Sequence, residues 1–205
     1  MTSRRSSTII DHAVAALWGA AEASAFFVVP DVWLSRLVLH DPKRAYLACG
    51  SALAGALVGG ILTRAWVQRV GAERSRAAMR ALPSISDEMI TRVEDGVREG
   101  GFRAAVAGPT KGVPYKLYVR AAALENIGLG PMLAWSVPGR LPRFLAVTAL
   151  GQLLQAGTSR VIGRERTSRI QMPTHTLVWI AFYSWYFTHV GREPQLPSSG
   201  VAKER

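Results

Sequence analysis

Two carboxylates stand in a stretch of the chain that is otherwise apolar. Glu22 is the single charged residue between His12 and Pro30, and Asp31 follows directly after Pro30. If this stretch lies in a membrane, each charge costs on the order of 3 kcal/mol on insertion scales, so it needs a partner or a task. We expect Glu22 and Asp31 to couple a proton or a cation, or to balance the charge of a bound group. The alternative is that Asp31 caps a helix and Glu22 pairs with a buried arginine.

Basic residues gather around a second interrupted stretch. Lys111 and Lys116 flank the sequence GVPY at 112–115, and Arg120 follows Lys116 by one helical turn, on the same helix face. The first turn of a helix beside cations attracts phosphate, through its free N–H groups and through the charges. We therefore predict that Lys116, Arg120 and Lys111 bind a phosphate group. The alternative is that the lysines extend to a membrane surface.

The other reactive side chains form no catalytic or metal-binding pattern. Arg140 and Arg143 are candidates for contact with a membrane interface or a lipid headgroup, and Cys49 is the single cysteine. The sequence contains no P-loop, nucleophile elbow, HExxH, paired CxxC or dinucleotide fingerprint. We predict no metal site, no cofactor and no enzymatic activity. The histidines are scattered without metal-ligand spacing, at His12, His40, His175 and His189.

Uncharged blocks of helix-forming residues must position these groups. Residues 45–63 and 170–191 carry no Asp, Glu, Lys or Arg, and about 20 such residues cross a bilayer as a helix. A soluble helical protein would need amphipathic faces, whereas residues 45–63 and 177–187 are apolar all round. We predict an all-α polytopic membrane protein with about four transmembrane helices. Their expected ranges are 43–68, 115–137, 143–159 and 173–190, with a tight corner at 138–142 before the third.

Two apolar segments are interrupted by helix-breaking residues. Pro30-Asp31 divides residues 11–40, and Gly108, Pro109, Gly112 and Pro114 fall within residues 104–118. Irregular backbone at membrane depth is tolerated only beside protein or a water-filled cavity. We therefore predict two re-entrant helical hairpins that approach each other from opposite faces.

The remaining segments complete the predicted organisation. Residues 1–10 form a basic lead, residues 11–191 a single membrane-embedded domain, and residues 192–205 a disordered tail. Residues 64–103 form a cytoplasmic loop with a short solvated helix over 87–98, capped by Ser86. If the arginine-rich loop at 160–170 is also cytoplasmic, the helices between the two loops run out and back. Small residues at Ser51, Gly55 and Gly59 favour close packing against another helix.

The net charge of +11 points to an anionic partner. The basic residues lie between the apolar blocks, as the positive-inside rule places them, so we expect anionic lipid headgroups and no nucleic acid as partners. We predict an integral protein of a bacterial cytoplasmic (inner) membrane, with a homo-oligomer as an open alternative.

Several motifs together resemble the DedA/VTT family, also called SNARE-associated membrane proteins. EASAFFVVPD at 22–31, with DPKRAYLACGSALAGALVGG at 41–60, resembles the family's first hairpin and the helix after it. GVPYK at 112–116 is similar to its second hairpin, and GRLPRF at 139–144 to its GRxxRF corner. The similarity covers about residues 12–155 without the loop at 64–103. Three departures indicate a divergent branch: Gly112 in place of a proline, Arg120 and Leu124 in place of small residues, and a shorter spacing between the acids.

This resemblance implies a fold of two opposing re-entrant hairpins packed with transmembrane helices, and a role in lipid handling. Family members are associated with recycling of undecaprenyl phosphate, proton-dependent membrane homeostasis and phospholipid scrambling. By position, Glu22 and Asp31 match the family's acidic pair, and Lys116 and Arg120 its basic residues. We therefore expect a transporter for an anionic lipid headgroup; the alternative is a membrane scaffold in which the charges form a structural network. A transporter predicts that these four residues converge on one cavity.

Overall fold

The protein folds into helices alone in the part of the chain that the structure describes, residues 2–108 and 112–189 of a computed structural model. The all-α prediction is therefore confirmed. The elements in chain order are α1 (Thr2–Glu22), α2 (Asp31–Val38), α3 (Pro42–Arg80), α4 (Asp87–Gly100), the 3-10 helix η1 (Gly101–Val106), α5 (Tyr115–Leu124), α6 (Leu129–Ile162) and α7 (Arg164–His189). Lys111 and the predicted tail at 192–205 lie outside the described residues.

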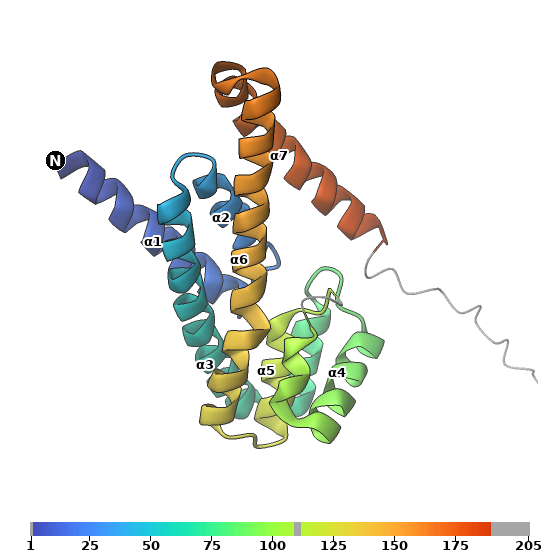
Figure 1. Cartoon of the computed structure of the whole chain (residues 1–205). Helices are drawn as coiled ribbons and strands as arrows, with labels where there is room; N and C mark the ends of the chain where they lie inside the picture. Colours follow the sequence, from blue (N-terminus) through green and yellow to red (C-terminus); the bar gives the residue numbers. More distant parts are fainter. Residues whose placement is uncertain (1, 109–111, 190–205) are drawn as a thin grey trace, which may run out of the picture.

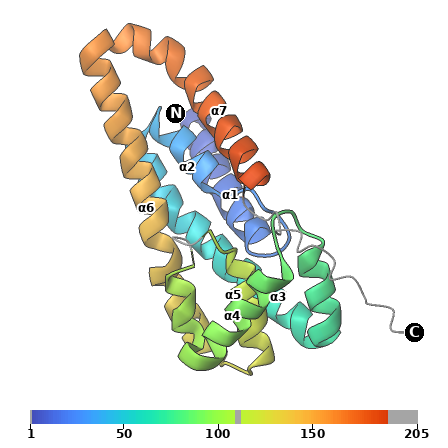
Figure 2. The same ribbon diagram turned by 90° about the vertical axis from the view of Figure 1, so that its right-hand side faces the viewer.

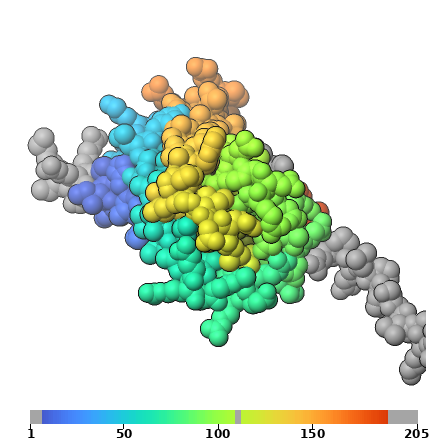
Figure 3. Space-filling model, turned by 90° about the horizontal axis from the view of Figure 1, so that it is seen from below, coloured from blue at the N-terminus to red at the C-terminus, as the bar shows by residue number. Residues whose placement is uncertain are grey.

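Two long helices, α3 and α6, lie side by side along the length of the molecule (Figure 1). Helix α1 crosses α3, and α4 and α5 form the lower body together with the end of α3 (Figures 1 and 2). Seen from below, the end of α3, α4 and the start of α6 make one continuous surface (Figure 3). Helix α7 returns from the upper end of α6 toward this lower body (Figure 2).

Glycines allow the backbones of α1 and α3 to touch. A Cβ atom on Gly55 would lie 1.8 Å from the carbonyl oxygen of Ala16, and one on Gly59 would lie 2.3 Å from that of Ala20. These distances are far below any van der Waals contact, so only glycine fits at either position. The prediction that the small-residue face of this helix permits close approach of another helix is confirmed, and the partner helix is α1.

Helix α3 begins where the sequence places it and runs beyond the predicted end at residue 68. The Asp41 carboxylate accepts a hydrogen bond from the Arg44 N–H at 3.1 Å, and Pro42 occupies the first turn, where its missing N–H is not needed. The helical path is interrupted at Gly71, with φ +80° and ψ −179°. Among the described residues, α3 is the one helix that is both long and apolar enough to cross a membrane. The four-span arrangement therefore stays a prediction.

The predicted helix over 115–137 and the corner at 138–142 are wrong. Helix α5 ends at Leu124, because Asn126 adopts a left-handed conformation with φ +54°. Helix α6 then runs without a break through Pro138 and Pro142. Tertiary packing outweighs the two missing N–H donors: Gly139 lies against the backbone of η1, and the side chains on either side of Pro142 are buried or half-buried in the protein.

The arginine-rich loop predicted at 160–170 is also wrong. Gly163 alone, with φ +84°, separates α6 from α7, and the four arginines of this segment lie in the two helices. Because α6 is a single helix, residues 64–103 and 160–170 lie at opposite ends of the molecule (Figure 1). The out-and-back path between the two basic segments is therefore wrong.

The short helix predicted at 87–98 exists as α4, and Ser86 caps it by accepting a hydrogen bond from the Met89 N–H at 3.1 Å. It is not a solvated helix. Its apolar residues Ile90, Val93 and Val97 are buried in the same core cluster as residues of α5. The segment 64–103 is therefore a packed part of the fold, because these three residues form an apolar stripe at helical spacing.

Candidate functional site

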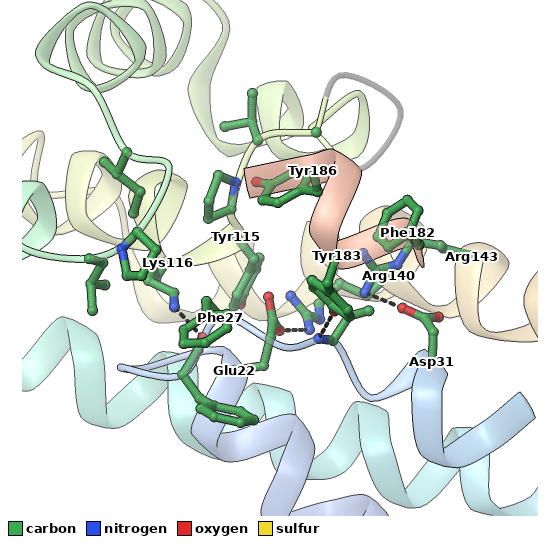
Figure 4. Close-up of a pocket in the computed structure, with 18 of the residues that line it drawn as sticks. Glu22, Phe27, Asp31, Tyr115, Lys116, Arg140, Arg143, Phe182, Tyr183 and Tyr186 are labelled. Carbon is green, nitrogen blue, oxygen red and sulfur yellow. Dashed lines mark hydrogen bonds and ion pairs between the residues drawn. The ribbon is translucent and has the colours of Figure 1, made fainter. Parts of the chain in front are cut away.

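The two interrupted segments meet at a cavity of about 390 Å³. The loop at 23–30 and the segment 112–114 both line it, and α6 and α7 close it from the other side (Figure 4). Its charged lining residues come from helices α1, α2, α5 and α6: Glu22, Asp31, Lys116, Arg140 and Arg143. The structure thus brings together three of the four residues expected to converge, and adds two arginines.

Both acids are held by arginines of α6. Glu22 is ion-paired with Arg140, and both side chains are buried. Asp31 Oδ2 lies 3.0 Å from Arg143 Nη2. Arg140 and Arg143 were expected at a membrane interface or headgroup, and the structure places them in the wall of the cavity, three residues apart on one helix. Their guanidinium groups balance the two carboxylates one for one.

Lys116 supplies the remaining positive charge. Its side chain is only 2% exposed, and Nζ donates a hydrogen bond of 2.5 Å to the carbonyl oxygen of Phe26 in the first loop. No carboxylate of the described residues forms an ion pair with it. An ammonium group with one neutral acceptor retains two further donors. By formal charge, the described lining holds three cations and two carboxylates, and Lys116 is the cation without an ion pair.

Several polar atoms at this site are buried without a partner among the described residues. They are Asp31 Oδ1, Arg140 Nε and Arg143 Nε. Buried polar atoms in proteins nearly always have a hydrogen-bond partner, so unpaired ones indicate positions where water or a ligand binds. Two of the three are cationic donors, which suit an anion.

Aromatic rings complete the wall of the cavity. The sequence did not predict that these residues belong to the site. The Arg140 guanidinium carbon lies 4.4 Å from the centre of the Tyr115 ring, whose hydroxyl is 2.6 Å from Ser136 Oγ. From α7, the Tyr183 hydroxyl accepts a hydrogen bond of 2.9 Å from the Val29 N–H. Tyr115 lies within the quoted GVPYK motif, but the α7 aromatics give no signal beyond their preference for interfaces.

A polar cluster attaches α7 to α2 near the cavity. Trp179 Nε1 donates to Ser35 Oγ at 3.0 Å, and His175 Nε2 lies 2.9 Å from the same hydroxyl. Ser35 also lies 2.6 Å from the carbonyl oxygen of Asp31, one turn earlier in α2. Ser35 and His175 do not line the cavity, so this pair positions helices rather than a ligand.

Arg120 is not part of the cavity, contrary to the expected common site with Lys116. Helix α5 is buried on all sides, so each of its turns contacts other parts of the protein. The first turn, with Lys116, faces the cavity, and the next turn, with Arg120, faces α3 and α4. Arg120 is ion-paired with Glu94 and donates to Ser75 Oγ at 2.9 Å and to the Ala72 carbonyl oxygen at 3.0 Å. Its guanidinium group therefore joins α3, α4 and α5 just beyond the break at Gly71.

We expect Arg120→Met to lower the free energy of unfolding by about 3 kcal/mol, because it removes the ion pair to Glu94 and the donor to the buried Ser75 hydroxyl. The effect is measurable by SDS-induced unfolding of the purified protein. Arg103→Met, at an exposed arginine of η1, is the matched control and should change stability little. A variant as stable as the wild type would show that Arg120 does not hold these helices together.

Comparison of the chain with protein-family models, with curated proteins and with solved structures finds no match in any of the three.

Proposed function

We propose that the protein is an integral membrane transporter whose cavity binds the anionic headgroup of a lipid and moves it between leaflets. The observation that carries the proposal is the excess positive charge of Lys116, buried where the two interrupted segments meet. A buried charge without an ionic partner is costly, and a bound anion would remove that cost. Ammonium and guanidinium N–H donors form strong charge-assisted hydrogen bonds with phosphate, the anionic group of many lipid headgroups.

The exposed surface of the helices supports a lipid environment. Large apolar side chains face outward along three helices, among them Leu47 and Leu62 of α3, Leu153 and Leu154 of α6, and Leu177 and Ile180 of α7, all at least 58% exposed. Extensive apolar surface marks contact with a membrane or another protein. We propose that α6 and α7 cross the bilayer together with α3, since about 20 residues are sufficient for one crossing.

The motif order that resembles the DedA/VTT family agrees with this assignment, and we propose membership of a divergent branch in a bacterial inner membrane. Undecaprenyl phosphate is one lipid that would fit the proposed site. Glu22 and Asp31 balance Arg140 and Arg143 within the protein, and a bound phosphate would compete with these carboxylates for the guanidinium groups. Asp31, with one oxygen unpartnered, is the carboxylate that would exchange a proton during transport.

Substitution of the unpaired cation tests the proposal. We expect Lys116→Met to reduce flipping of a fluorescent anionic phospholipid in proteoliposomes by about tenfold, the effect of losing roughly one charge-assisted hydrogen bond. Lys43→Met, at an exposed lysine of α3, is the matched control and should leave the rate unchanged. Wild-type flipping by Lys116→Met, at equal protein content, would remove Lys116 from the transport site.

A membrane scaffold is the second candidate, because both acids of the cavity are already ion-paired within the protein. In a scaffold, Lys116→Met changes stability and affects no lipid flux.

A further inference from the structure

A second cavity, of about 340 Å³, lies next to the charged one. It is bounded by the start of the first loop and by the parts of α3 before and after the break at Gly71. Its lining residues are Ser24, Ala25, Leu62, Thr63, Trp66, Ala78, Met79 and Leu82. None of them carries a charge.

The two hydroxyl groups in this second cavity are already used within the protein. Ser24 Oγ donates to the carbonyl oxygens of Ala20 and Ala21, at 2.9 and 3.0 Å. Thr63 Oγ1 donates to the Ala23 carbonyl oxygen at 3.0 Å. A hydrogen-bond acceptor on a ligand therefore finds no free hydroxyl donor in this cavity, whereas a hydrocarbon chain has no hydrogen bonds to lose.

The second cavity adjoins the charged one. Leu82 lines both cavities. In the first loop, Ser24 and Ala25 line the apolar cavity, and the next two residues, Phe26 and Phe27, line the charged one. A molecule with an anionic end and a hydrocarbon chain would thus meet suitable surroundings at both ends.

The second cavity opens to the outside of the protein beside α3, the helix that is apolar enough to span a membrane. Leu62 and Trp66 are 61% and 38% exposed, and both belong to α3. A chain can therefore enter from the side of α3 without crossing the charged cavity.

We propose that the apolar cavity holds the first part of the hydrocarbon chain of the same lipid whose anionic headgroup occupies the charged cavity. The inference rests on the proposed function, since it takes the headgroup site as given. It adds that the protein selects its ligand by the chain as well as by the charge. Each methylene group that leaves water strengthens binding by about fourfold.

Binding of alkyl phosphates of different length tests the inference. Butyl phosphate reaches the charged cavity alone, and octyl phosphate is long enough to extend beyond it. With wild-type protein in nanodiscs, corrected for binding to empty nanodiscs, we expect octyl phosphate to bind at least tenfold more tightly than butyl phosphate. We expect Ala78→Phe, which fills the apolar cavity, to reduce this preference to less than threefold and to leave butyl phosphate binding unchanged.

The neighbouring residue provides the control. Ala77 is also exposed on α3 but does not line the cavity, so Ala77→Phe should keep the wild-type preference for the longer chain. A full preference in Ala78→Phe, with butyl phosphate still bound, would overturn the chain site and leave the headgroup site intact. No binding of butyl phosphate to the wild type would overturn the proposed function, and the chain site with it.

Discussion

Gly55→Ala is expected to destabilise the protein by about 3 kcal/mol, the upper end of the range for overpacked cores. The added methyl group would lie 1.8 Å from the carbonyl oxygen of Ala16 and 2.6 Å from its carbonyl carbon. Both are backbone atoms, so no side-chain rotation relieves the clash, and α1 must move away from α3. SDS-induced unfolding of the purified variant measures the loss.

Gly50→Ala in the same helix is the control. A Cβ atom on Gly50 has no neighbour within 4 Å, so this change should leave the fold intact and stabilise α3 by up to about 1 kcal/mol through helix propensity. If Gly55→Ala proved as stable as Gly50→Ala, the close crossing of α1 and α3 would be refuted.

Removal of one partner from the Glu22 and Arg140 ion pair is expected to cost about 3–5 kcal/mol of folding free energy, because it leaves the other charge buried and uncompensated. Glu22→Gln leaves three cations around the cavity with Asp31 as their only carboxylate among the described lining residues. Arg140→Met leaves the Glu22 carboxylate buried and also removes the cation above the Tyr115 ring. Each single variant should therefore unfold at clearly lower SDS concentration than the wild type.

The double variant measures the interaction between Glu22 and Arg140 apart from the interactions of each residue with the rest of the protein. Glu22→Gln with Arg140→Met should be at least about 2 kcal/mol more stable than the sum of the single effects predicts, since neither charge is then left alone. The same cycle at Glu165 and Arg169, an exposed pair whose atoms are 2.6 Å apart, should give a coupling within about 0.5 kcal/mol. Additive effects at Glu22 and Arg140 would contradict a mutual dependence of the two buried charges.

Local signals in the sequence were sufficient for the starts of α3 and α4. Asp41 with Pro42, and Ser86, predicted where α3 and α4 begin, because a cap acts on N–H groups of its own helix. The breaks at Pro30 and at Gly112 were also predicted, and they bring Glu22, Asp31 and Lys116 to one cavity.

What the sequence could not supply is decided by contacts between distant segments. Nothing near Arg140 indicates Glu22, its partner 118 positions earlier. The two prolines of α6 favour a corner locally, whereas Gly139 and Phe144 between and after them are buried against other elements of a continuous helix. Lys116 and Arg120 are one helical turn apart, so the sequence predicts one shared site. It does not show that Ser75 and Glu94 bind Arg120 and leave Lys116 to the cavity.

The glycine crossing of α1 and α3 also limits how the charged cavity can rearrange. Glu22 lies only two residues after Ala20, whose carbonyl oxygen contacts the backbone at Gly59. The backbones of α1 and α3 touch at Gly55 and Gly59, and residues with side chains stand on either side of these glycines. A shift of α1 along α3 by a fraction of a turn would therefore bring backbone atoms into collision with side chains. The Glu22 carboxylate is thereby held at a fixed height in the molecule. Adjustment to a ligand would therefore fall to the opposite wall of the cavity, which α6 and α7 form.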